Sequence, residues 1–313
     1  MVRLVIFLHS FPFLLAKEGE NDYNKANEPV VLTGILNGLG VRAMYLMDYH
    51  THSMCSPDSN ARLEDMAYAA RRAGMREMCT TDHCDLQQQD GSPLQSWDWE
   101  PILNQYERIR TRFGKGSFRV RLGLELGGAQ TDPDRAEEIL AGAPLDFVIG
   151  SIHNQSPAVG GRDLFYIDYS SREYCEKLLD DYLDSLLKLA PLPCYDALGH
   201  IIYPLRYIGR AGYEFPHNPW GERLDPVLKT VIETGRAIEI NTHAGREVED
   251  WFPIVKRYKE LGGEFITLGS DAHRPGNVAL GLEQAALMLQ AAGFRYLTRY
   301  RRRKPDPIKI ATK

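Results

Sequence analysis

The sequence predicts an α/β fold built on a parallel β-sheet. Short β-rich runs alternate with helical patterns, no low-complexity linker divides the chain after residue 44, and a polar side chain follows the end of every β-run. With 313 residues, 43% of them hydrophobic, the chain is long enough to bury one large core. The formal net charge of -5 argues against a general nucleic-acid-binding protein, which needs a strong basic field.

The N-terminal segment differs in composition from the rest of the chain. The run LVIFLHSFPFLLA is apolar over only 13 residues, which is too short to span a bilayer, and no A-x-A cleavage site follows it. The next stretch, KEGENDYNKANEP, is polar and typical of disorder. We therefore predict that residues 1–43 are an extension, disordered or produced by a misplaced start, and that residues 44–313 form a single domain. A targeting segment is the alternative.

The β-runs follow one another at spacings that leave room for a helix between them. We predict strands at residues 45–49, 77–81, 119–124, 146–151, 195–199, 237–241 and 265–269. No Gly-rich dinucleotide fingerprint follows the first strand, which disfavours a Rossmann domain. An open doubly wound sheet and a closed barrel both fit this pattern.

Helical patterns separate several of these strands. Residues 61–74 place Leu63, Met66 and Ala70 near a 3.6-residue period and end at Gly74. Similar patterns predict helices over residues 171–190, 225–235, 249–263 and 277–294. The C-terminal run RYRRRKPDPIKI is predicted to be a solvated turn with an edge strand rather than a nucleic-acid-binding tail.

Histidines and acidic residues gather at the ends of the predicted strands. In chain order the ends carry His50 with His52, Asp82 with His83, Glu125, His153, His200, Asn241 with His243, and Asp271 with His273. In a parallel barrel these ends meet at one mouth, where crowded imidazoles and carboxylates would lose solvation unless cations compensate. Imidazole and carboxylate ligands without thiolate favour Zn, Mn or Fe, and more than six ligands require two or three ions.

The ordered motifs HTHS, TDH, GLELG, GSIH, GHIIYPLRY, EINT and GSDAH resemble those of the PHP (polymerase and histidinol phosphatase) superfamily, and within it the stand-alone histidinol-phosphate phosphatases. The resemblance spans residues 44 to about 300. It implies a distorted (β/α)7 TIM-like barrel with a three-metal site at the C-terminal ends of the strands. Its implied ligands are His50, His52, Glu125 and Asp271 for one ion, Glu125, His153 and His200 for the second, and Asp58, His83 and His273 for the third.

The resemblance also implies an activity. The protein would hydrolyse L-histidinol phosphate to L-histidinol and phosphate, as in histidine biosynthesis, by attack of a metal-bridging hydroxide. Glu125 and Asp271 would be catalytic through the ions that they hold. Asp82 is predicted to orient His83. The family usually has NTSG where this chain has NTHAG, so His243 lines the pocket, donates a proton to the leaving alkoxide or caps the loop.

Arg206, Arg246 and Arg162 follow strands and are candidate phosphate-binding residues. The predicted partner is a small phosphorylated substrate, with no nucleic acid and no membrane, and the sequence gives no indication of an oligomeric state. The five cysteines form no CxxC pair and are predicted to be reduced, which favours the cytoplasm. The alternatives are a PHP phosphoesterase acting on nucleotides or nucleic-acid ends, and a non-catalytic metal-binding regulatory domain.

Overall fold

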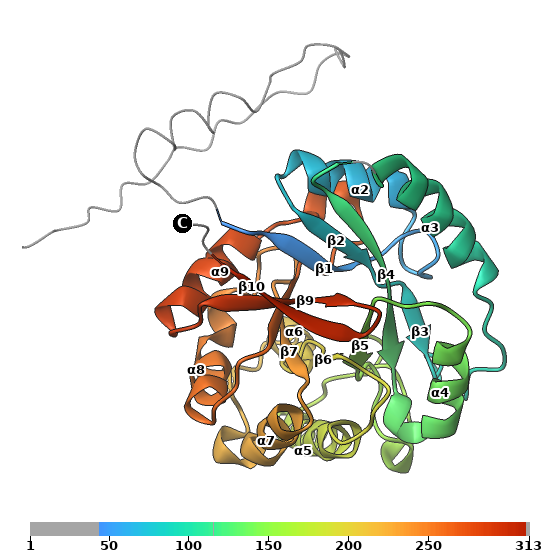
Figure 1. Ribbon diagram of the computed structural model, residues 1–313. Coiled ribbons are helices and arrows are strands. Elements are labelled where there is room, and N and C mark those ends of the chain that lie inside the picture. Colours follow the sequence, from blue (N-terminus) through green and yellow to red (C-terminus); the bar gives the residue numbers. More distant parts are fainter. Residues whose placement is uncertain (1–43, 115, 311–313) are drawn as a thin grey trace, which may run out of the picture. The chain divides into compact units, whose positions relative to one another are not determined.

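A parallel sheet curves into a nearly closed barrel in the computed structural model, which describes residues 44–114 and 116–310 (Figure 1). Its strands are β1 (Met47–Thr51), β2 (Glu77–Thr80), β3 (His83–Asp85), β4 (Arg119–Gly127), β5 (Phe147–Ser151), β6 (Ala197–Leu198), β7 (Ala237–Asn241) and β8 (Ile266–Gly269). They pair in the order β1-β2-β4-β5-β6-β7-β8, and β3 also pairs with β4. A parallel bridge between Thr51 and Ala272 brings the two ends of this order together. The barrel prediction is therefore confirmed, and the open sheet is excluded.

The predicted second strand corresponds to β2, and a short strand that was not predicted, β3, follows it closely. β2 ends at Thr80, and β3 begins at His83. Between them the backbone N–H of Thr81 donates to Thr51 at 2.8 Å, and the carbonyl of Asp82 accepts from the backbone N–H of Glu125 at 3.1 Å. The chain thus turns away from β1 and runs along β4, which places His83 beside Glu125.

Most of the helices surround the strands, whereas α6 is seen at the centre of the barrel, behind the hairpin, in Figure 1. They are α2 (Leu63–Arg72), α3 (Glu100–Phe113), α4 (Pro133–Ala141), α5 (Arg172–Leu189), α6 (Tyr203–Arg210), α7 (Asp225–Glu233), α8 (Phe252–Glu260) and α9 (Leu282–Ala291). The five predicted helices are confirmed, with shorter bounds. Helices α3, α4 and α6 were not predicted from the sequence. In α4 the signal is local, because Asp132 accepts a hydrogen bond from the backbone N–H of Arg135 and Pro133 occupies the first turn.

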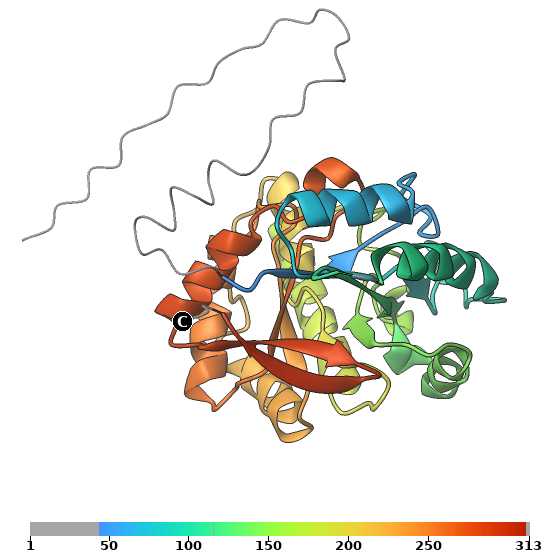
Figure 2. The same cartoon turned by 45° about the horizontal axis from the view of Figure 1, so that its top comes forward.

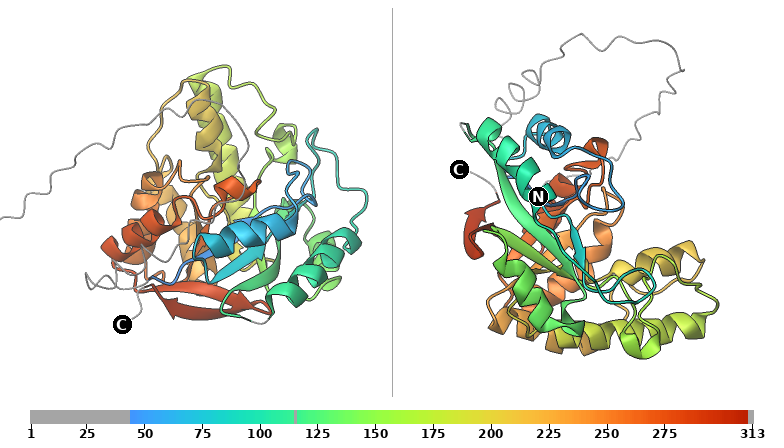
Figure 3. Two further views of the ribbon diagram at one scale, coloured as in Figure 1. Left: turned by 90° about the horizontal axis from the view of Figure 1, so that it is seen from above. Right: turned by 90° about the vertical axis from the view of Figure 1, so that its right-hand side faces the viewer.

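An antiparallel hairpin covers the N-terminal end of the barrel. Its strands are β9 (Tyr296–Arg301) and β10 (Lys304–Lys309), and it crosses in front of the barrel in Figure 1 and lies along its lower side in Figures 2 and 3 (left view). The Tyr300 ring lies 5.0 Å from that of Phe147, and the backbone N–H of Arg303 donates to Asp146 at 3.0 Å. The C-terminal ends of the strands lie at the opposite side of the barrel, where the hairpin does not cover them. The candidate site lies at these ends.

Two predictions about the termini have different outcomes. The predicted extension, residues 1–43, lies outside the described residues, so the domain boundary at Met44 stays a prediction. The predicted edge strand near the C-terminus lies within the hairpin, as β10. Within the described part of the chain, no helix combines the length and the apolar character needed to cross a membrane.

Candidate metal centre

The nine predicted ligands come together at the C-terminal mouth of the barrel. They lie in or directly after strands, except for Asp58 in the segment between β1 and α2. His50, His52 and Glu125 are fully buried, and His200 is 1% exposed. Buried groups of this kind are costly unless they are paired or bind metal ions.

Glu125 lies at the centre of this cluster. Its Oε1 is 2.7 Å from His200 Nε2 and 3.1 Å from His153 Nε2. Its Oε2 is 3.1 Å from His50 Nε2 and 3.0 Å from His83 Nδ1. Burial opposes ionisation of this carboxyl, but the facing charges of His50, His83 and His153 hold its pKa well below the usual range. Each carboxylate oxygen therefore faces its own set of imidazoles, as a bridging ligand requires.

The first set of nitrogens and oxygens fits a metal ion. Asp271 Oδ1 lies 3.6 Å from His50 Nε2 and 3.4 Å from His52 Nε2. His52 Nε2 is buried and has no hydrogen-bond partner among the described residues, although two carboxylates are near. Ligand atoms around a tetrahedral ion with bonds of about 2.0–2.1 Å lie about 3.4 Å apart. The observed separations match that value better than they match hydrogen bonds.

The second set of predicted ligands fits a metal ion for a different reason. The Nε2 atoms of His153 and His200 lie 3.2 Å apart, and both face Glu125. Two imidazole nitrogens that point at one another need a proton or a cation between them. Glu125, His153 and His200 form one of the groups whose ligand atoms all lie within 4.8 Å of one another.

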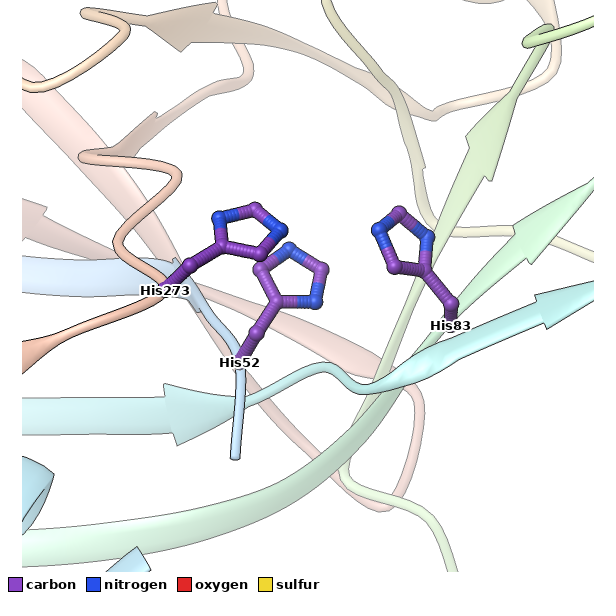
Figure 4. A group of neighbouring side chains, drawn as sticks. All are labelled: His52, His83 and His273. Carbon is purple, nitrogen blue, oxygen red and sulfur yellow. The ribbon is translucent and has the colours of Figure 1, made fainter. Parts of the chain in front are cut away.

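The third set differs in part from the sequence prediction. Figure 4 shows His52, His83 and His273 around one shared space, and these three side chains form a group within the same 4.8 Å limit. Asp58 Oδ2 lies 2.9 Å from His273 Nε2 and 3.6 Å from His83 Nε2. His52 is thus close to both the first and the third sets, and Asp58 approaches the third set from its exposed side.

Comparison with known proteins identifies the family. The PHP domain model matches residues 48–243, more than half of the chain. The chain belongs to the PHP domain family. A Clostridium acetobutylicum relative named "Probable histidinol-phosphatase" is 30% identical over 254 residues, which cover 78% of this chain and 93% of the relative. The histidinol-phosphatase of Lactococcus lactis subsp. lactis is 27% identical over 279 residues, which cover 86% of this chain and 100% of the relative.

A solved structure supports the same fold. The histidinol phosphate phosphatase of Lactococcus lactis, crystallised with zinc, L-histidinol and phosphate, superposes with a TM-score of 0.73 at 24% identity. The match covers 84% of this chain and 100% of that one. The PHP barrel fold predicted from the sequence is therefore confirmed.

Carboxylates outside the predicted ligand set fix the imidazoles of this PHP site. Glu239 Oε1 lies 2.6 Å from His50 Nδ1, and its Oε2 accepts the backbone N–H of His200 at 3.0 Å. Asp85 Oδ1 lies 2.6 Å from His153 Nδ1. When Nδ1–H of a histidine donates to a carboxylate, the proton stays on Nδ1 and the lone pair of Nε2 is free to face a metal ion. Neither carboxylate was predicted from the sequence, although Glu239 is the first residue of the EINT motif and Asp85 lies two residues after TDH.

Asp82 supports a different histidine from the one predicted. Its carboxylate accepts from Ser53 N at 2.6 Å and from Ser56 Oγ at 2.8 Å, and Ser56 Oγ lies 3.0 Å from His52 Nδ1. His83 contacts the same serine only through its backbone N–H, at 3.1 Å. Asp82 therefore orients His52 through Ser56, and no contact with the His83 ring is found.

Asp48 fixes the segment that carries Asp271. The buried Asp48 carboxylate accepts from Ser270 N at 2.9 Å, Ser270 Oγ at 2.6 Å and Ala279 N at 3.0 Å. Asp271 itself has a φ of 57°, in the left-handed region that non-glycine residues rarely adopt. The hydrogen bonds to Asp48 on the residue before it hold this backbone conformation in place.

Arg206 is buried and has three partners. Nε donates to Glu247 at 2.8 Å, Nη1 to Asp271 at 3.0 Å and Nη2 to Asn241 at 2.8 Å. Burial opposes its charge, but Glu247 and Asp271 raise the pKa of the guanidinium above its ordinary value. In this arrangement Arg206 positions Asp271, and its predicted contact with phosphate stays a prediction.

The other predicted substrate residues lie at varying distances from the centre. His243 is half-buried, and burial and the Arg206 charge lower its pKa to about 3, which favours the neutral imidazole. Its predicted role in the pocket stays a prediction. Arg246 is exposed and donates from Nε to the His243 carbonyl at 2.9 Å. Arg162 lines a separate cavity that shares no lining residue with the one over the metal centre.

Proposed function

We propose that the protein is a metal-dependent phosphomonoesterase that hydrolyses L-histidinol phosphate to L-histidinol and phosphate. The position of Glu125 between two sets of imidazoles is the observation that carries the metal-dependent chemistry. The named histidinol-phosphatases among the relatives support the substrate, and the Lactococcus lactis structure holds zinc together with L-histidinol and phosphate. The cytoplasm stays the predicted compartment.

The proposed ion number is two or three, with Zn, Mn or Fe as the metal. His50, His52, Glu125 and Asp271 would hold the first ion. Glu125, His153 and His200 would hold the second, and Asp58, His83 and His273 the third. When bound, such ions supply an activated water and neutralise the charge that develops on the phosphoryl oxygens.

The side chains of this chain contribute orientation. Glu239 and Asp85 hold the rings of His50 and His153 at Nδ1, so that each Nε2 points at Glu125. Arg206 fixes one oxygen of Asp271 and leaves the other directed at His50 and His52. The ligand geometry therefore exists before substrate arrives, as efficient electrostatic catalysis requires.

A substrate panel tests this proposal. Purified protein with Zn or Mn is assayed for phosphate release from L-histidinol phosphate, nucleoside monophosphates and phenyl phosphate. We expect the highest kcat/KM with L-histidinol phosphate. Faster release from the nucleotides would replace our substrate by the nucleotide alternative.

A variant tests the role of Glu125. Glu125→Gln removes the charge that faces both sets of imidazoles, and we expect turnover to fall by at least about a hundredfold. Glu283→Gln, an exposed change of the same kind in α9, is the matched control. Near-normal turnover of Glu125→Gln with metal still bound would contradict the proposed mechanism.

A further inference from the structure

One large cavity opens onto the metal centre. Its volume is about 920 Å³, and Asp58, His83 and His153 form part of its wall. The size falls within the ordinary range for small-molecule sites, roughly 300–1,000 Å³. The substrate would therefore enter here, with its phosphate at the metal end.

The rest of this cavity is acidic. Its other charged lining residues are Asp85, Asp90 and Asp163, and none of the described residues that line it is a lysine or arginine. A phosphate would be repelled from these carboxylates, so it belongs at the metal end. The alcohol half of the substrate then lies among carboxylates, which favour a cation.

Only one of the three carboxylates is both sheltered and uncommitted to another side chain. Asp85 is paired with His153 at 2.6 Å, and Asp90 is exposed and accepts the backbone N–H of Ser92 at 2.9 Å. Asp163 is half-buried, and the hydrogen bond found for its carboxylate is from the backbone N–H of Phe165 to Oδ1, at 2.7 Å. Its second oxygen is the natural partner for a ligand cation.

Backbone hydrogen bonds tie the Asp163 segment to Gln89 and to the predicted metal ligand His153. Its own N–H donates to the carbonyl of Gln89 at 3.1 Å, and the N–H of Leu164 donates to the carbonyl of His153 at 2.8 Å. Asp163 also forms a bridge with Asn154, the residue after His153. A substrate bound at both ends is thereby held at a defined length.

Aromatic rings stand beside Asp163. Phe165 is 57% exposed and Tyr166 is 49% exposed, and both line the cavity together with Tyr207. Large exposed aromatic side chains at a cavity rim are suited to stacking on a planar ring and to cation–π contact. L-histidinol offers both an imidazole ring and an ammonium group.

We propose that Asp163 binds the cationic half of the substrate, with Phe165 and Tyr166 against its ring, and that this contact selects cationic over neutral phosphomonoesters. The inference rests on the proposed phosphatase function. Asp163 is a specificity-determining residue in this scheme and takes no part in the attack on phosphorus.

The test compares two substrates in three forms of the holoenzyme. The wild type, Asp163→Asn and Asp168→Asn are assayed with L-histidinol phosphate and with phenyl phosphate, which has no cation. Asn keeps the oxygen that accepts from Phe165 and replaces the second, charged oxygen by an NH₂ group, so the acceptor proposed for the cation is lost. Asp168→Asn makes the same change of charge on the same connecting segment but lines the separate cavity, so it is the matched control.

We expect Asp163→Asn to lower the ratio of kcat/KM for histidinol phosphate to that for phenyl phosphate at least about tenfold, mainly through KM, since a charged hydrogen bond is lost. The control should keep the wild-type ratio. An unchanged ratio in Asp163→Asn would overturn the role of Asp163 but not the proposed substrate. A wild type without preference for histidinol phosphate overturns the proposed substrate as well.

A second variant keeps the inference testable if Asp163→Asn does not fold or bind metal. Phe165→Ala removes a ring that is 57% exposed, so little packing is lost. We expect the KM for histidinol phosphate to rise about threefold, the size of an exposed cation–π contact. An unchanged KM for Phe165→Ala would overturn the aromatic part of the site, and with an unfolded Asp163→Asn it would overturn the whole inference.

Discussion

Glu239 offers the sharpest test of how this site is organised. It is 1% exposed, and its two oxygens serve two ligands, His50 through Nδ1 at 2.6 Å and His200 through the backbone N–H at 3.0 Å. Glu239→Gln keeps the size of the side chain but turns one acceptor into an NH₂ donor. Whichever way the amide is oriented, its NH₂ faces either the His50 ring or the N–H of His200.

The magnitude follows from these two contacts. Loss of such an outer carboxylate typically lowers metal affinity or activity 10- to 100-fold, which is about 1.4 to 2.8 kcal/mol. Both contacts of Glu239 lead to ligands that face Glu125, so we expect the variant to lie near the upper end of this range. The nine ligands themselves are unchanged.

Metal affinity is measured by competition with a chromophoric chelator, and kcat/KM is measured at saturating metal. Glu77→Gln is the control, because Glu77 is also buried, 2% exposed, and bonded to Tyr49 and Arg121 at the opposite end of the barrel. We expect Glu77→Gln to lower the melting temperature and to leave metal affinity unchanged. Wild-type metal affinity in a folded Glu239→Gln protein would refute the positioning role of this carboxylate.

Three further predictions follow from other contacts. Arg206→Lys loses the planar fork that joins Asp271 to Asn241, so kcat/KM should fall about tenfold while the protein still folds, as circular dichroism can check. Removal of metal with a chelator should lower the melting temperature and abolish turnover, and Zn or Mn should restore both, because ions at about 100 times their Kd stabilise by about 2.7 kcal/mol. Burial raises the pKa of Asp196 from 3.8 to about 6, so its folded form holds a proton more tightly than its unfolded form and stability is lost as pH rises from about 4 to 6. Asp196→Asn should reduce this pH-dependent loss of unfolding free energy by about 3 kcal/mol. The unfolding free energy of variant and wild type is measured by denaturation between about pH 4 and 6, and the same pH dependence in both proteins would contradict the prediction.

The candidate ligands could be grouped from the sequence because their signal is local. Each of them lies at or just after a β-run, except for Asp58, and parallel strands bring such positions to one mouth. His50, Glu125 and Asp271 could therefore be grouped without coordinates, and the resemblance to PHP proteins assigned them to ions. The assignment of His83 and His273 to one set was compatible with the structure, but the closeness of His52 to both depends on ring orientation, which no sequence pattern carries.

The partners of the ligands were missed because they are distant in sequence. His50 and Glu239 are 189 residues apart, so their hydrogen bond depends on how β7 is placed against β1. The contacts of Arg206 could not be predicted from the sequence for the same reason. Its place after a strand indicated a phosphate-binding residue, whereas its burial and its contacts with Glu247, Asp271 and Asn241 depend on three other segments.

Two glycines leave the space that the carboxylate–histidine pairs occupy. A Cβ at Gly269 would collide with the Glu239 carboxylate and with Cβ of His50, and a Cβ at Gly127 would collide with the Asp85 carboxylate that holds His153. Both glycines have ordinary backbone conformations, with φ outside the left-handed region, so backbone freedom does not explain them. Because these two positions have no side chain, the carboxylates can reach the imidazoles. The motifs GLELG and GSDAH therefore contain the glycines that make room for these carboxylates as well as the candidate ligands.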